Sequence, residues 1–340
     1  MQPAEISALC APDKFRGTLT AREVAAAMAA GLRDEGIEHV VELPLADGGE
    51  GTLDALLAAR GGGRREAVVT GPDGRPVIAS WGLLPDGVAV IELAEASGLA
   101  RVEGENDPVT ATTRGTGELI LAAAEAGATA VVLGVGGSAT VDGGVGALEA
   151  LGWALPIPMT VACDVETPFV EAAAIYGPQK GAGPAEIEQL TYRLEELAER
   201  YRAETGIDVR ALPGAGAAGG IAGGLAAFGA VLRPGFGVVA EAAGFADRLA
   251  GATLVLTGEG RLDHTSLAGK VVGEVLGAAA MHGTRAGVVA GEIEKGISRR
   301  LPGEPAVVSL VELAGSVEEA LARASELVGE AAAELGRRLT

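Results

Sequence analysis

The chain has 340 residues, of which 48% are hydrophobic, and a formal net charge of −20. This length suits one large domain or two ordinary ones, with ample apolar side chains for a core. A chain this acidic, with only 3% aromatic residues, is not expected to bind nucleic acid through a general basic surface or through base stacking.

Both cysteines lie in apolar runs, as buried free thiols do in a reducing compartment. The chain shows no signal-peptide pattern and no uninterrupted apolar run long enough to cross a membrane. We therefore expect a cytoplasmic protein with no membrane partner.

The first 65 residues alternate between strand and helix patterns. Short apolar strands are expected at 6–11 and 39–45. The helix between them begins at Thr20, which has capping-box spacing to Glu23, and a second helix is expected at 53–60. A βαβα order of this kind indicates parallel strands.

The pattern changes in the middle of the chain. Residues 66–93 alternate in the manner of antiparallel strands, with turns at two Pro-Asp-Gly triplets. Further on we expect helices at 117–126 and 184–203, and strands at 130–133 and 159–163. From about residue 240 the earlier alternation returns. There we expect strands at 252–256, 287–290 and 306–310 and helices at 265–281 and 317–339.

Residues 134–144 form a glycine-rich segment between a strand pattern and a helix pattern. This order presents backbone N–H groups and the positive end of a helix dipole to an anion. Ser138 and Thr140 add hydroxyl groups, and Asp142 adds a carboxylate that can hold a cation. We expect the segment to face phosphate, although a tight turn that binds nothing has the same pattern.

The outer segments alone supply five strands, the number in a flavodoxin-like sheet of order 2-1-3-4-5. We expect α/β architecture: a discontinuous flavodoxin-like domain at 1–65 and 240–340, and an inserted mixed α/β domain at 66–239. Ligands bind such sheets outside the carboxyl ends of the strands, at the switch point of the strand order. Three neighbouring strand ends carry the polar residues Asp13, Lys14, Arg16, Asp47, Glu50, Glu259, Arg261 and Asp263.

This mixture suits phosphoryl transfer, which needs cations against phosphate and a carboxylate that holds Mg²⁺ or accepts a proton. Only four of the 26 basic residues are lysines. Three of these, Lys14, Lys180 and Lys270, lie in turn-rich segments, where a compact ammonium suits phosphate or carboxylate. The sequence has no P-loop and no G-x-S-x-G. Its literal G-x-G-x-x-G at 214–219 follows Pro213 instead of a strand, so dinucleotide binding is not expected there.

Taken together, the motifs resemble one family, the bacterial glycerate kinases of the first type. They stand in that family's order from about residue 9 to 270: APDKFRGTL, ADGGEGT, VTGPDG, IELAEASGL, ATTRGTGELI, LGVGGSATVDGG, ACDV with GPQKGA, PGAGAAGG, and TGEGRLD with SLAGK. The resemblance implies ATP-dependent phosphorylation of D-glycerate, with Mg²⁺ and with 2-phosphoglycerate as the expected product. It also implies a site in the cleft between two α/β domains.

The motif positions imply the following roles. Catalytic residues are Asp47, Lys14, Asp164 and Lys270. Residues that bind phosphate, nucleotide or substrate are Asp13, Arg16, Gly48, Gly49, Glu50, Gly51, Thr52, Ser97, Thr113, Gly115, Thr116, Gly136, Gly137, Ser138, Lys180, Gly216, Gly219, Glu259 and Arg261. Candidate Mg²⁺ ligands are Asp142 and Asp263.

The chain departs from the family between Trp153 and Met159, where it is markedly shorter. Because a missing peripheral segment can carry subunit contacts, a homodimer stays an open alternative. Two other functions stay open as well. One is a kinase or phosphatase for another small hydroxy or sugar acid, and the other is a catalytically silent ligand-binding regulator. The motifs leave the adenine pocket unassigned, and they do not separate ATP-binding from glycerate-binding residues.

Overall fold

The structure is a computed structural model of the chain, and it describes residues 6–267 and 269–340. The chain divides into two compact units. Unit 1 comprises the residues up to Asp47 together with Asp54–Arg60 and Phe236–Thr340, and unit 2 comprises Gly48–Leu53 and Gly61–Gly235.

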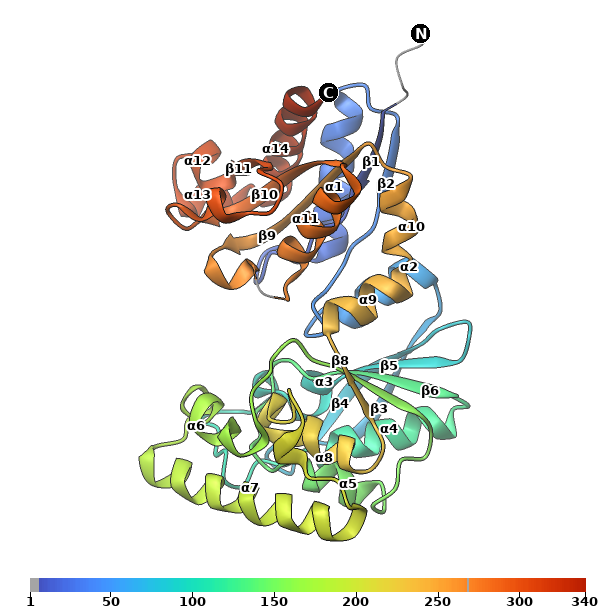
Figure 1. Cartoon of the computed structure of the whole chain (residues 1–340), viewed down its shortest axis with the longest axis vertical. Helices are drawn as coiled ribbons and strands as arrows, with labels where there is room; N and C mark the ends of the chain where they lie inside the picture. Colours follow the sequence, from blue (N-terminus) through green and yellow to red (C-terminus); the bar gives the residue numbers. More distant parts are fainter. Residues whose placement is uncertain (1–5, 268) are drawn as a thin grey trace. The chain divides into compact units, whose positions relative to one another are not determined.

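Unit 1 is built on a five-stranded, fully parallel sheet of order β11-β10-β9-β1-β2 (Figure 1). Numbered within the unit, this is the predicted flavodoxin-like order 2-1-3-4-5, which is therefore confirmed. Strand β1 lies inside the sheet and is apolar, and its Leu9 pairs with Val41 on one side and Val255 on the other. The strands are β1 (Ser7–Cys10), β2 (His39–Glu42), β9 (Leu254–Leu262), β10 (Arg285–Ile293) and β11 (Ala306–Ser309).

Helices cover both faces of this sheet, because successive residues of a strand point to opposite faces. Val289 packs into the core beneath α1 and α14, whereas its neighbours Val288 and Ala290 pack with α11. The capping box at Thr20 and Glu23 that the sequence predicts is present at the start of α1. The helices are α1 (Ala21–Asp34), α2 (Thr52–Arg60), α9 (Gly235–Ala243), α10 (Phe245–Ala250), α11 (Val271–His282), α12 (Leu310–Ala314), α13 (Val317–Ala322) and α14 (Ala324–Leu339).

Three predicted boundaries in unit 1 are wrong. Strand β9 does not end at Leu256 but continues to Leu262. The helix expected at 265–281 begins only at Val271, after a short 3₁₀ turn at His264–Leu267; position 268 lies outside the described residues. The helix expected at 317–339 is broken at Arg323 into α13 and α14.

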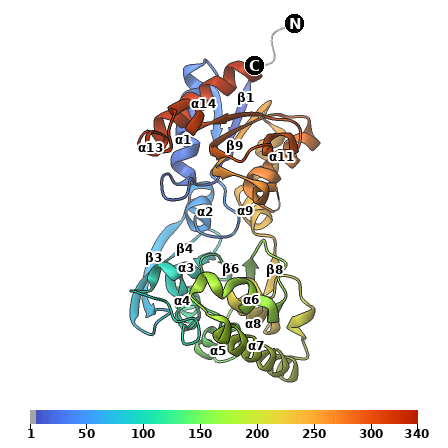
Figure 2. The same cartoon turned by 90° about the vertical axis from the view of Figure 1, so that its left-hand side faces the viewer.

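Unit 2 contains a six-stranded mixed sheet of order β3-β4-β5-β6-β7-β8 (Figure 2). Its first three strands are antiparallel, as the alternation over 66–93 predicts, and the remaining pairs are parallel. The strands are β3 (Gly63–Thr70), β4 (Pro76–Leu83), β5 (Val88–Glu92), β6 (Ala130–Gly134), β7 (Met159–Ala162) and β8 (Val231–Arg233).

The helices of unit 2 bury one continuous apolar core against this sheet. The long charged helix α7 places Leu190, Leu194 and Tyr201 in that core and leaves its acidic and basic residues outside. The helices are α3 (Leu93–Ser97), α4 (Arg114–Glu125), α5 (Val145–Ala150), α6 (Ala172–Tyr176), α7 (Pro184–Thr205) and α8 (Ile221–Ala227).

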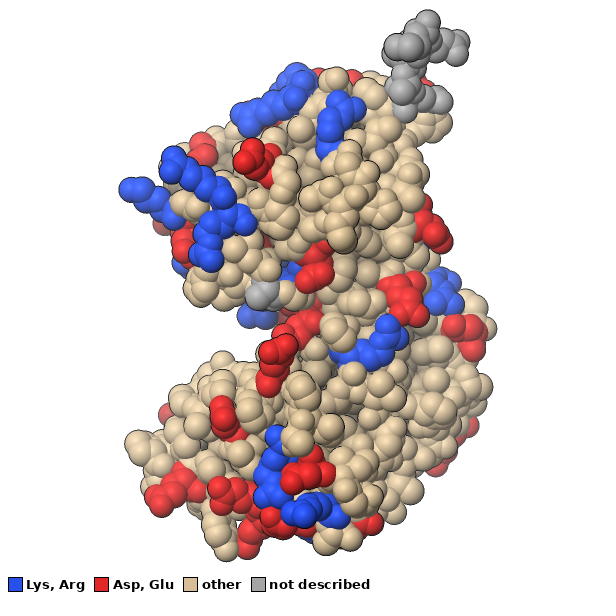
Figure 3. Space-filling view, in the orientation of Figure 1, with Lys and Arg blue, Asp and Glu red and all other residues tan. Residues whose placement is uncertain are grey.

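The surface of each unit carries acidic and basic side chains side by side. On the face drawn in Figure 3, the two signs are interspersed, with large uncharged areas between them. Within residues 6–267 and 269–340, no helix combines the length and the apolar character that crossing a membrane requires.

Candidate active site

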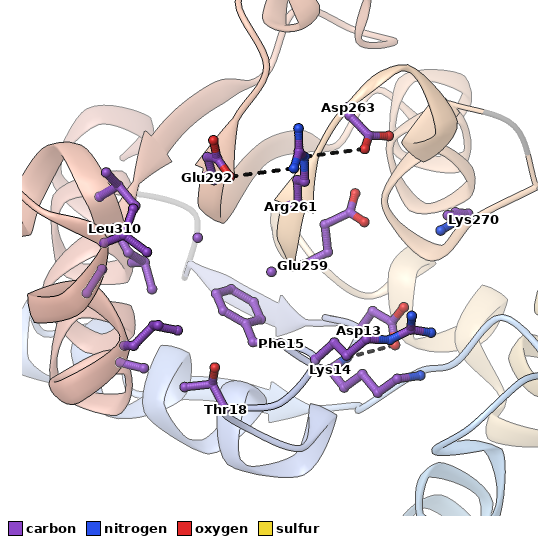
Figure 4. A pocket seen from close by; sticks show the side chains of 18 of the residues that line it. Asp13, Lys14, Phe15, Thr18, Glu259, Arg261, Asp263, Lys270, Glu292 and Leu310 are labelled. Carbon is purple, nitrogen blue, oxygen red and sulfur yellow. Dashed lines mark hydrogen bonds and ion pairs between the residues drawn. The ribbon is translucent and has the colours of Figure 1, made fainter. Parts of the chain in front are cut away.

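A cavity of about 450 Å³ lies in unit 1 at the carboxyl edge of its parallel sheet (Figure 4). The segments that follow β1, β2 and β11, the ends of β9 and β10, and the start of α11 all contribute to it. The cavity brings together most of the strand-end residues that the sequence singles out. These are Asp13, Lys14, Arg16, Asp47, Glu259, Arg261, Asp263 and Lys270.

Asp13 is held by the backbone pairing of its own segment with β9. Its amide donates to the carbonyl of Gly258 (2.9 Å), and its Oδ1 accepts from the amide of Lys14 (2.7 Å). Burial raises the pKa of the Asp13 carboxyl to about 6, and the nearby charge of Asp47 adds to the rise. Lys14 and Lys270 act in the opposite direction. Asp13 therefore lies within electrostatic reach of three other residues that line the cavity.

Glu259 reaches the cavity from the last part of β9. Burial raises the pKa of its carboxyl to about 7, the charges of Asp13 and Asp263 add to the rise, and Ser266 and Lys270 oppose it. Its Oε1 atom is buried and has no hydrogen-bond partner in the described part of the chain. A buried, unpaired carboxylate oxygen is costly. The Glu259 side chain lines the cavity, where a bound cation would stabilise its charged form.

The basic side chains come from several different elements. Lys270 is the N-cap residue of α11, and its charge lowers the pKa values of Asp13 and Glu259. Arg261 lies between two carboxylates, with its Nε 3.7 Å from Asp263 and its Nη1 3.9 Å from Glu292. The cavity thus offers positive charge next to carboxylates, the combination that phosphoryl transfer requires.

Asp263 has a structural task beside the cavity. Its Oδ1 accepts from the amide (2.8 Å) and the hydroxyl (2.6 Å) of Thr265, and the hydroxyl bond lowers the pKa of the carboxyl. This arrangement fixes the turn that leads toward Lys270. It also engages the Oδ1 atom of the carboxylate in hydrogen bonds.

The carboxylates of the cavity fit a magnesium ion only together with a substrate. No group of three or more His, Cys, Asp or Glu side chains among the described residues is arranged to hold a metal ion. Mg²⁺, however, is ordinarily held by one or two carboxylates, waters and substrate phosphates. Asp13 and Glu259 are such a pair, and the Oε1 of Glu259 has no protein partner in the described structure.

The model of the glycerate kinase family matches residues 8–157 and 154–340. The chain belongs to the glycerate kinase family. A glycerate 2-kinase of Escherichia coli is 44% identical over 299 residues, which cover 77% of this chain and 78% of that protein. A glycerate kinase of Halalkalibacterium halodurans is 37% identical, with 95% of each chain covered.

The fold agrees with this membership. A crystal structure from Salmonella typhimurium assigned as glycerate kinase 2 has a TM-score of 0.84 and 35% identity, with 98% of each chain covered. Glycerate kinases are phosphotransferases, so this chain is a phosphotransferase of that family. The two parts of the family match meet at residues 154–157, within the segment where the chain is shorter than expected.

Unit 2 of this glycerate kinase family member contains the other motif residues. The segment Gly48–Leu53 packs there against the glycine-rich segment that follows β6. A Cβ on Gly134 would lie 2.5 Å from the carbonyl of Gly48, and one on Gly136 would lie 2.9 Å from the Cα of Gly49. Only glycine permits this approach, so two motifs that are far apart in sequence share one backbone contact.

Glu92 contacts the segment Gly48–Leu53, and the sequence motifs did not assign it a role. It ends β5, it is 7% exposed, and its Oε1 accepts from the amides of Gly51 (2.9 Å) and Leu53 (2.8 Å). These amides belong to the start of α2, where a carboxylate is favourable. The signal was available, because an acidic residue closes the otherwise apolar strand Val88–Glu92. Thr52 adds a bond from its hydroxyl to the carbonyl of Gly49 (2.7 Å).

Asp142, a predicted magnesium ligand, accepts several hydrogen bonds within unit 2. It is buried, and its Oδ2 accepts from the amide and the hydroxyl of Thr113 (both 2.8 Å). The amides of Gly144 and Gly146 donate to the same carboxylate at 3.0 and 3.3 Å. This carboxylate joins the loop after β6 to the start of α4. Its hydrogen bonds within the protein take the place of those that it would make to water in the unfolded chain.

Lys180 joins the same loop from the opposite side. Its Nζ donates to the hydroxyl of Ser138 (2.6 Å) and to the carbonyl of Thr140 (2.7 Å). Burial lowers the pKa of this amine to about 7, and the charge of Asp142 opposes the fall. Ser138 and Lys180, which the motifs assign to ligand binding, thus form a buried pair that shapes the loop.

The remaining predicted residues of unit 2 lie in tightly packed positions. The hydroxyls of Ser97 and Thr116 are 2.8 Å apart, and Gly115 lies directly against the carbonyl of Thr70. Gly216 and Gly219 pack against backbone carbonyls of other loops. Asp164 accepts a hydrogen bond from the amide of Gly235 (2.6 Å).

Two further predicted residues of unit 2 differ from these. The side chain of Glu50 is exposed. The carbonyl of Gly137 accepts a hydrogen bond from the amide of Leu99.

Proposed function

We propose that the protein transfers the γ-phosphoryl group of ATP to the O2 hydroxyl of D-glycerate, giving 2-phosphoglycerate and ADP. The observation that carries this proposal is the cavity of unit 1. Four basic side chains and four carboxylates of the family's motifs line it, and one of the carboxylate oxygens has no hydrogen-bond partner among residues 6–267 and 269–340. Family membership supplies glycerate as the acceptor.

Lys14 and Lys270 bind the anionic groups of the substrates. Both line the cavity, and both lower the pKa of the Asp13 carboxyl, so their charges act at the same point. An ammonium is a compact charge that suits a phosphate oxygen. Near Asp13, the ammonium groups of Lys14 and Lys270 offset the negative charge that develops as the bond between the β- and γ-phosphates breaks.

Asp47 accepts the proton of the attacking hydroxyl. As the O2 oxygen forms its bond to the γ-phosphorus, the bond from that phosphorus to the bridging oxygen breaks, and ADP leaves with the bonding electron pair. The hydroxyl proton passes to the Asp47 carboxylate, so atoms and charge balance. Asp164 is the alternative base, but its Oδ1 already accepts from the amide of Gly235.

A magnesium ion held by Asp13 and Glu259 would neutralise phosphate charge during the transfer. The residues themselves suit that task, because both carboxyl groups are buried among other acids, and a cation stabilises their charged forms.

A coupled assay of ADP release tests the proposal. D-glycerate with Mg-ATP should give turnover, whereas L-glycerate, tartronate and larger sugar acids should be poor substrates. Carbon-13 NMR of the product should show phosphorus coupling centred on C2. Coupling centred on C3 would replace the proposed product by 3-phosphoglycerate. Nucleotide binding with no turnover on any acid would favour the ligand-binding regulator, and turnover on another acid alone would favour the alternative kinase.

A further inference from the structure

The cavity of unit 1 has two chemically different ends. In Figure 4, Asp13, Lys14 and Lys270 lie on one side and Leu310 on the other, with the ring of Phe15 between them. The charged end lies over β1 and β9, at the switch point of the sheet. The other end lies over β10 and β11, where Glu292 stands beside a group of side chains that form an apolar wall. This wall consists of Phe15, Leu310, Val311, Val317 and Leu321.

The apolar wall has two exposed side chains, which both come from α13. Val317 and Leu321 are 53% and 57% exposed, and they stand one turn apart on α13. Leu310 and Phe15 are buried beneath them. Contiguous exposed apolar side chains beside a concave surface are typical of a ligand site.

Glycerate alone does not account for this wall. Each of its three carbons bears oxygen, so it has no group that gains from contact with aliphatic side chains. The cavity also extends from β1 to β11, three strand spacings apart, or about 14 Å. This length suits an elongated ligand that is charged at one end and flat and apolar at the other.

We propose that this cavity is the nucleotide site, with the purine base against the apolar wall and the triphosphate directed toward Lys14 and Lys270. The inference rests on the use of ATP in the proposed function, and it names the adenine pocket that the motifs leave unassigned. The base is held by burial against aliphatic side chains and the Phe15 ring. Glycerate then meets the triphosphate at its γ-phosphate end, beside Asp47.

The experiment measures separately how much the base end and the phosphate end of the nucleotide contribute to binding. Adenosine, ADP and inorganic tripolyphosphate are titrated by calorimetry, in Mg²⁺ and without glycerate, into the wild type and a Val317→Gln/Leu321→Gln double variant. The substitutions are neutral and lie at exposed positions, so the fold should tolerate them. Leu313→Gln is the matched control, because Leu313 is 40% exposed on α12 but does not line the cavity.

We expect the double variant to lose about tenfold or more in affinity for adenosine and ADP, because part of the buried apolar contact is lost. Its affinity for tripolyphosphate should stay within twofold. Lys270→Met should instead lower the affinity for tripolyphosphate and for ADP while the affinity for adenosine stays within twofold, and Leu313→Gln should bind all three probes like the wild type. In steady-state kinetics, the KM for ATP should rise in the double variant while the KM for glycerate stays within twofold.

Unchanged adenosine and ADP affinity in the double variant would overturn the inference, as would a rise in the KM for glycerate alone. The proposed function fails in a different way. A wild-type protein that binds ADP through the apolar wall but phosphorylates no glycerate would refute the activity and leave the nucleotide site in place. Turnover of glycerate by a double variant with undiminished ADP affinity would refute only the nucleotide site.

Discussion

The backbone amide of Asp13 donates to the carbonyl of Gly258, the residue before Glu259. Burial raises the pKa of the Glu259 carboxyl, and the charge of Asp13 adds to that rise. The two acids come from positions 246 residues apart in the chain, and adjacent parallel strands bring them together. Lys14 and Lys270 compensate these two acids only in part, because the pKa values of both carboxyls stay raised. Its presence at the carboxyl edge of the sheet supports a binding role for both residues.

Glu259→Gln should therefore weaken the response to magnesium. We expect the Mg²⁺ concentration for half-maximal activity to rise about tenfold or more. The rise in melting temperature that Mg-ADP gives should shrink as well, which is a readout independent of turnover. Glu292→Gln is the matched control, because Glu292 lines the same cavity but is exposed beside Arg261. Equal effects of the two substitutions would argue against a specific role for Glu259.

Asp47→Asn should lower kcat by about 10²- to 10⁴-fold, the usual contribution of a general base. The melting temperature and the KM for ATP should change much less than kcat, because asparagine has nearly the same size and shape as aspartate. Asp164→Asn provides the comparison. Asp164 holds the amide of Gly235, so we expect a lower melting temperature with kcat within about tenfold of the wild type. The reverse pattern would make Asp164 the base.

Lys270→Arg should lose activity although the positive charge is kept. The guanidinium is planar and wide, whereas the site beside Asp13 and Glu259 suits a compact ammonium. We expect kcat/KM for ATP to fall by about tenfold or more. Lys295→Arg is the control, because Lys295 is exposed on a loop that does not line the cavity. Full activity of Lys270→Arg would show that charge alone is sufficient there.

The buried amine of Lys180 predicts a pH-dependent stability. Burial lowers its pKa to about 7 in the folded protein, against 10.5 for an ordinary lysine. Between these values the unfolded chain binds more protons, so this group makes stability rise with pH. The gain from pH 7 to pH 9 is about 2 kcal/mol.

Urea unfolding of the wild type and of Lys180→Met at pH 7 and pH 9 measures this gain. The variant should lose most of the rise with pH. It should also be less stable at pH 9, because Ser138 and the Thr140 carbonyl lose their donor. Parallel pH dependences for the two proteins would exclude Lys180 as the source.

The order of the unit 1 sheet and the polar edge of that sheet could be predicted from the sequence. Alternating strand and helix patterns favour one doubly wound topology, and parallel strands place their carboxyl ends together. Asp13, Asp47 and Glu259 therefore share one cavity, as their positions after three apolar runs indicate. The apolar wall could not be found in this way, because Val317 and Leu321 have the pattern of an ordinary amphipathic helix.

Glycine caused the main error in the fold prediction. Gly258 and Gly260 resemble a turn after residue 256, yet both lie inside β9. A Cβ at Gly258 would lie 2.2 Å from the carbonyl of Val289, so the residue is small because another strand is close. The pairing of Lys180 with Ser138 was equally hidden, because 42 residues separate them and only the tertiary fold joins them.

Two helical glycines of unit 1, Gly31 and Gly277, differ in how closely other atoms approach them. Substituting each by alanine tests how α1 packs. A Cβ at Gly31 of α1 would lie 2.0 Å from the carbonyl of Gly329 in α14, whereas a Cβ at Gly277 of α11 would meet no atom within 4 Å. Gly31→Ala must push the two helices apart, and we expect a loss of about 1–3 kcal/mol in unfolding free energy. Gly277→Ala should instead gain about 0.5–1 kcal/mol, because alanine restricts the unfolded chain and favours the helix. Denaturant unfolding of both variants checks the opposite signs, and equal effects would show that α1 and α14 do not pack through Gly31.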